Sequence, residues 1–175
     1  MEQTEAVNLS GTDVQKLQKR IRFLILFFMA ALAVSGITAI PLIFEIGILN
    51  KLFGVGTGFA SVWPAMSEWV SYVYEGLTVT NQNYPFIAYG TDWLAFAHIM
   101  IAIAFIGPLR DPVRNIWVIE FGMIACVLLI PLALVFGPIR GIPFVWRMID
   151  CSFGVFGIIP LWFIRRDIQQ LSLQN

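Results

Sequence analysis

The feature of this sequence that most constrains its fold is a set of four long apolar stretches. They cover approximately residues 23–44, 93–109, 116–137 and 144–164. A helix needs roughly 20 predominantly apolar residues to cross the hydrocarbon core of a bilayer. Only helices and closed barrels satisfy every backbone polar group at that depth. The sequence therefore predicts an all-α protein in which four transmembrane helices form a bundle.

The composition of the chain agrees with this class of protein. Hydrophobic residues make up 58% of the 175 residues and charged residues only 13%, whereas soluble domains carry roughly 25% charged residues. We therefore expect a single integral membrane domain over residues 1–175, in contact with the lipid bilayer. The formal net charge is zero, so we expect no nucleic-acid partner.

The residues before the first apolar stretch predict a short amphipathic helix over about residues 12–22. Val14, Leu17 and Ile21 lie on one stripe of such a helix. The helix is expected on the cytoplasmic side, where it would lead into the first span. That apolar stretch is longer than the 7–15 residues of a signal-peptide core, so we interpret it as an uncleaved membrane anchor.

The orientation of the chain follows from the lysines and arginines near the span ends, which favour the cytoplasmic side. The side that holds both termini and the 110–115 turn carries Lys16, Lys19, Arg20, Arg22, Arg110, Arg114, Arg165 and Arg166. The opposite side carries Lys51, Arg140 and Arg147. This excess predicts a multi-pass protein of the cell membrane with both its N-terminus and its C-terminus in the cytoplasm.

The longest connection, residues 45–92, is expected on the outer side and is too apolar for a free linker. Its aromatic and aliphatic residues recur at helical spacing, which predicts an amphipathic helix at the membrane interface. The candidate interfacial residues are Trp63, Trp69, Tyr72 and Tyr74. This segment would either cover the bundle or provide a surface for a protein partner.

Ionisable side chains gather in the outer half of the predicted bundle, and such groups are expensive at membrane depth. The candidates for a ligand or proton site are Asp92, His98, Arg140, Arg147 and Asp150, with Glu45 nearby. A histidine beside an aspartate would transfer protons, and two arginines would hold an anionic group. Alternatively, Asp92 caps its helix, Arg147 pairs with Asp150 at i, i+3 spacing, and His98 bonds a backbone carbonyl.

Glu120 is a secondary candidate, because it lies near the cytoplasmic end of the third span. It would be either a functional carboxylate or an ordinary interfacial residue that is neutralised by a neighbouring cation.

No catalytic or cofactor motif is evident in the sequence. One histidine cannot supply a bis-histidine haem, and no Cys/His spacing suits zinc. We therefore expect no cofactor and no metal. The leading expectation is a non-enzymatic accessory or interaction subunit that binds a protein partner or forms a homo-oligomer. The alternatives are a small-ligand or proton-coupled carrier that uses the outer polar cluster, and a membrane enzyme that acts on a lipid or quinone.

Overall fold

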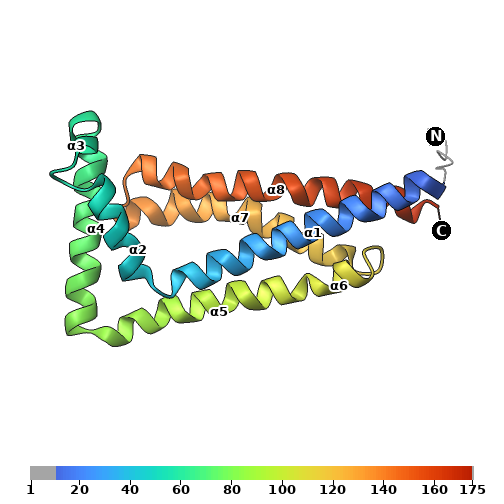
Figure 1. Cartoon of the computed structure of the whole chain (residues 1–175), viewed down its shortest axis with the longest axis horizontal. Helices are drawn as coiled ribbons and strands as arrows, with labels where there is room; N and C mark the ends of the chain where they lie inside the picture. The colour runs from blue at the N-terminus through green and yellow to red at the C-terminus, as the bar shows by residue number, and fades with distance from the viewer. Residues whose placement is uncertain (1–10, 175) are drawn as a thin grey trace. The chain divides into compact units, whose positions relative to one another are not determined.

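The structure is a computed structural model, and it describes residues 11–174 of the chain. Every regular element in this range is helical (Figure 1). In chain order, the elements are α1 (Gly11–Ala39), α2 (Leu42–Phe53), α3 (Gly58–Val62), α4 (Pro64–Asn83), the 3₁₀ helix η1 (Pro85–Ala88), α5 (Tyr89–Ala104), α6 (Ile106–Arg110), α7 (Ile116–Ile139) and α8 (Phe144–Ser172).

Four helical segments of the described chain are long and apolar enough to cross a membrane. They are Gly11–Ala39, Pro85–Arg110, Ile116–Ile139 and Phe144–Ser172. The last three contain the second, third and fourth apolar stretches that the sequence singles out, and Gly11–Ala39 contains most of the first. The predictions of an all-helical fold and of four apolar helices of spanning length are therefore confirmed.

The chain divides into two compact units. The terminal unit consists of the residues up to Ala31 together with those from Ala102 onward, and the central unit is Leu32–Ile101. The boundaries fall inside α1 and α5, so each of these helices contributes to both units.

The terminal unit is built around α7 and α8, which run side by side in opposite directions (Figure 1). Their close approach depends on glycine, because a Cβ atom at Gly154 would lie 2.5 Å from the Cys126 carbonyl oxygen. In α8 the buried apolar residues Leu161, Ile164, Ile168 and Leu171 follow a three-four-three spacing. That spacing places them on one face of the helix, which forms the core of this unit.

The N-terminal amphipathic segment and the first apolar stretch form one continuous helix, α1. Its C-terminal end differs from the prediction, since α1 ends at Ala39 and not at Phe44. Pro41 explains the difference, because proline has no N–H to donate and its ring clashes with the preceding helical turn. Residues 42–44 instead begin α2, where the N–H of Glu45 donates to the Pro41 carbonyl.

Two further helix ends differ from the prediction. The second apolar segment is divided into α5 and α6 around Phe105, because Pro108 cannot donate to the carbonyl four residues earlier. The last helix does not end at Arg165–Arg166 but continues to Ser172. No glycine or proline interrupts this extension, and Ile168 and Leu171 continue the apolar face.

The central unit contains a second helical hairpin, formed by α2 and α4. A polar contact joins them: the Ser71 hydroxyl donates to Asn50 Oδ1 at 2.7 Å and accepts from the Val55 N–H at 2.9 Å. The helix expected within the 45–92 segment is present as α4, with Pro64 in its first turn. Helices α2 and α3 were not predicted from the sequence.

Candidate functional site

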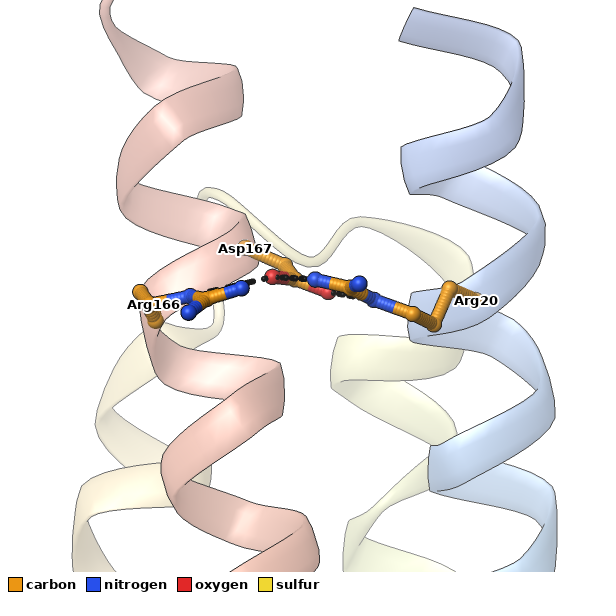
Figure 2. A network of polar contacts seen from close by, with 3 residues as sticks. All are labelled: Arg20, Arg166 and Asp167. Atoms are coloured by element: carbon orange, nitrogen blue, oxygen red, sulfur yellow. Dashed lines mark hydrogen bonds and ion pairs between the residues drawn. The ribbon is translucent and has the colours of Figure 1, made fainter. Parts of the chain in front are cut away.

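A buried carboxylate network lies between α1 and α8 in the terminal unit, and we call its three residues, Arg20, Arg166 and Asp167, the Asp167 network (Figure 2). The side chain of Asp167 is fully buried. Arg20 donates from Nε to one carboxylate oxygen and from Nη2 to the other. Arg166 approaches from the opposite side, with Nε 3.7 Å from Asp167 Oδ1. Two guanidinium groups thus compensate one buried negative charge.

The helical register of α8 explains why Asp167 is buried. Asp167 lies between Ile164 and Ile168, which are both buried on the core face of α8. On α1, Arg20 directly precedes the buried Ile21, so the Arg20 side chain projects from the edge of the buried apolar face of this helix. The Arg20 side chain is 47% exposed, so water reaches one partner of the pair while the carboxylate stays dry.

Arg166 has a second set of contacts that fixes its guanidinium group. Its Cζ atom lies 5.5 Å from the ring centroid of Trp162 and 5.6 Å from that of Phe163. Cation–π contacts within about 6 Å are attractive. Arg166 therefore combines a long contact to Asp167 with two aromatic contacts on its own helix, and Arg20 provides the direct hydrogen bonds.

A second ion pair joins α7 to α8 close to the Asp167 network. Arg165 Nε donates to Glu120 Oε1 at 2.9 Å. The two side chains are 38% and 43% exposed, and exposed pairs of this kind contribute between about 0 and 1 kcal/mol. The structure thus gives Glu120 an arginine partner, whereas a functional role for this carboxylate remains a prediction.

Three of the predicted outer residues belong to the terminal unit. Arg140 is exposed at the C-terminal end of α7. Arg147 packs its aliphatic chain against Gly137 and places Cζ 5.3 Å from the Phe144 ring centroid. Its Nε atom is buried without a hydrogen-bond partner. Asp150 is half-buried, and within residues 11–174 no ion pair joins it to Arg147, so the pair expected from their spacing is not formed.

The other two predicted residues, Asp92 and His98, belong to the central unit. Asp92 is exposed in the first turn of α5. His98 is half-buried, and its Nδ1 lies 2.8 Å from the Leu94 carbonyl oxygen. A carbonyl oxygen only accepts, so Nδ1 is the donor and Nε2 is the nitrogen left for another partner. The predicted five-residue site is divided between two units, and its assembly remains a prediction.

The four candidate interfacial aromatic residues differ in exposure. Trp63 and Tyr72 are exposed, at 41% and 68%. Trp69 is half-buried, with its ring centroid 5.8 Å from that of Tyr72. Tyr74 is also half-buried and faces Gly47 of α2. Two of these side chains therefore contribute to packing within the central unit, and the other two are available to lipid or to a partner.

The central unit also contains a cavity of about 250 Å³ beside the break between α1 and α2. Its walls come from residues 40–44, from α4 through Leu77, Thr80 and Asn81, and from the η1–α5 segment through Ile87, Ala88 and Thr91. None of these side chains is titratable. The cavity thus suits an apolar group better than acid–base chemistry.

Sequence reasoning missed Asp167, the most buried carboxylate among the described residues. Interpreting Arg165–Arg166 as the end of the last helix placed Asp167 outside it. The available signal was the spacing of Ile164, Ile168 and Leu171, which continues the core face through this position. An aspartate on the core face of a helix requires a cationic partner, and the basic residues of α1 were among the candidates on the same predicted side.

Comparison of the chain with protein families, with curated proteins and with solved structures finds no match to any of them. Within the described range, no three His, Cys, Asp or Glu side chains are grouped as metal ligands would be.

Proposed function

We propose that this chain is a multi-pass protein of the cell membrane that acts as a non-enzymatic accessory or interaction subunit. In this proposal the four apolar helices form a bundle, α4 lies at the outer membrane interface, and both termini are cytoplasmic. A protein partner or a second copy of the chain binds the exposed apolar surface of the central unit.

The observation that carries the proposal is the number of large apolar side chains that the central unit exposes outside its predicted spans. Val62 is 82% exposed, Val55 is 65% exposed and Leu52 is 59% exposed. Exposed apolar surface of this kind marks contacts with membranes or with other proteins. In the terminal unit, by contrast, Asp167 and Glu120 have arginine partners, which is typical of structural carboxylates.

The contact between Arg20 and Asp167 supports a common side for the two termini. Arg20 lies near the start of α1 and Asp167 near the end of α8, and their side chains meet. Together with the basic residues around them, this contact favours the cytoplasmic assignment of both ends.

We expect a cysteine at Val55 to react with a membrane-impermeant maleimide on intact cells, and a cysteine at Leu173 to react only after permeabilisation. The two side chains are similarly exposed, at 65% and 69%, so a difference in labelling would report membrane side. Cys126 and Cys151 are first replaced by alanine. Labelling of both positions under the same condition would contradict the orientation.

We also expect the protein, extracted in a mild detergent, to purify with a partner at fixed stoichiometry. Changing Val62 to glutamate should reduce the bound partner at least about tenfold, because a charge in the core of an interface must be desolvated. The control variant Val62→Leu should retain the partner. Size-exclusion chromatography with light scattering measures the ratio, and a monomer without partner would contradict the proposal.

A further inference from the structure

A groove of about 320 Å³ lies between α1 and α8 in the terminal unit, next to the Asp167 network. Asp13, Lys16, Leu17 and Arg20 of α1 line it, together with Gln170 of α8. The α1 residues lie at positions i, i+3, i+4 and i+7 and therefore share one helix face. Two cations, one carboxylate, an amide and an apolar leucine thus face one hollow.

Arg20 is oriented for binding by its contact with Asp167. A guanidinium group has five N–H donors in a fixed plane, and Asp167 accepts from only two of them. The side chain is nearly half exposed while it lines the groove. The remaining donors are held in place by a buried carboxylate, so little side-chain freedom is lost when an anion binds.

Lys16 provides the second positive charge and is held only weakly. Its ammonium group lies 3.5 Å from Asp13 Oδ1, and the two side chains are 78% and 47% exposed. An exposed pair of this length contributes little free energy. Lys16 can therefore turn toward a stronger anion such as a phosphate, and the carboxylate of Asp13 opposes that binding by repulsion.

The surface next to the groove identifies the kind of anion. Phe23, Leu26 and Phe27 follow Arg20 on α1 and are 68%, 51% and 59% exposed. Phe23 lies one helical turn from Arg20, so an exposed apolar surface of α1 begins directly beside the groove. A molecule that fits both features has a phosphate joined to acyl chains.

We propose that this groove binds the phosphate of an anionic phospholipid, with the acyl chains along the exposed face of α1 that begins at Phe23. Arg20 and Lys16 contact the phosphate, and Gln170 donates from its amide. Lys19 and Arg22 add long-range attraction to an anionic leaflet. This inference requires membrane insertion but does not depend on the protein partner proposed above.

The test uses the full chain in a non-ionic detergent and native mass spectrometry. Dioctanoyl phosphatidylglycerol is titrated against dioctanoyl phosphatidylcholine, with inorganic phosphate as a competitor. We expect phosphatidylglycerol to bind at least about tenfold more tightly than phosphatidylcholine. Lys16→Gln should weaken its binding about fivefold, because it removes one of the two cations that contact the phosphate in the groove. Asp13→Asn should strengthen the binding.

The matched control is Lys19→Gln, which removes the same charge from the same helix but from a residue that does not line the groove. It should change the affinity less than about twofold. Equal losses of affinity for the two lysine variants would contradict binding in the groove and leave only general electrostatic attraction. Equal binding of both lipids would contradict a preference for an anionic headgroup. Inorganic phosphate binding as tightly as phosphatidylglycerol would overturn the assignment to a lipid.

Discussion

Replacement of Arg20 by alanine is expected to destabilise the protein by about 3 kcal/mol. Asp167 is fully buried, and removing one partner of a buried pair leaves an uncompensated charge at a cost of roughly 3–5 kcal/mol. The lower end of this range of cost applies here, because the Arg20 side chain is nearly half exposed. Arg166 cannot replace it, since its guanidinium lies over Trp162 and Phe163 at a longer distance from the carboxylate. Reversible unfolding in mixed micelles, followed by circular dichroism, measures the loss.

Two further variants separate charge compensation from simple packing. In the double variant Arg20→Met, Asp167→Leu, both charges are replaced by apolar groups, and most of the lost stability should return. Glu120→Gln disrupts the exposed pair with Arg165 and should cost less than about 1 kcal/mol. If the double variant were as unstable as Arg20→Ala, packing of the arginine side chain would explain the loss. If Arg20→Ala unfolded like the wild type, the network would have no structural role.

One ion pair that is present and one expected pair that is not formed show which parts of the site could be predicted from the sequence. The contact between Arg20 and Asp167 joins residues 147 positions apart, so no local spacing predicts it. The pair expected between Arg147 and Asp150 relied on i, i+3 spacing alone. In the structure, the small volume of Gly137 lets the Arg147 side chain lie against α7 instead. Such pairing depends on the neighbouring helix and not on the helix that carries the residue.

The fold was predictable to the extent that it depends on composition and length. An uncharged apolar stretch of about 20 residues has few alternatives to a helix of spanning length, and all four were found. Helix ends were less predictable, because they depend on single residues. Pro41 ends α1 earlier than hydropathy suggests, and the polar extension of α8 continues as a helix because its core face continues.

The second large effect is expected at Gly154, where the α8 backbone packs closely against the α7 backbone. A Cβ atom there would lie 2.5 Å from the Cys126 carbonyl oxygen, a distance that only a movement of the α7 backbone can relieve. Overpacking of this kind costs about 1–3 kcal/mol and sometimes more. Because the obstructing atom belongs to the backbone, Gly154→Ala should cost about 3 kcal/mol. The same unfolding measurement as for Arg20 determines the effect.

Gly76 in α4 provides a control with the opposite expected sign. It is also a helical glycine, but a Cβ atom at this position meets nothing within 4 Å. Alanine is favoured over glycine inside a helix by about 1 kcal/mol, so Gly76→Ala should stabilise the protein slightly. Apolar helices in lipid gain little from excluding water and rely on close contact between small residues. If Gly154→Ala also stabilised the protein, α7 and α8 would not pack as closely as described here. The position of Asp167 on α8 relative to α7 would then also differ from the one described.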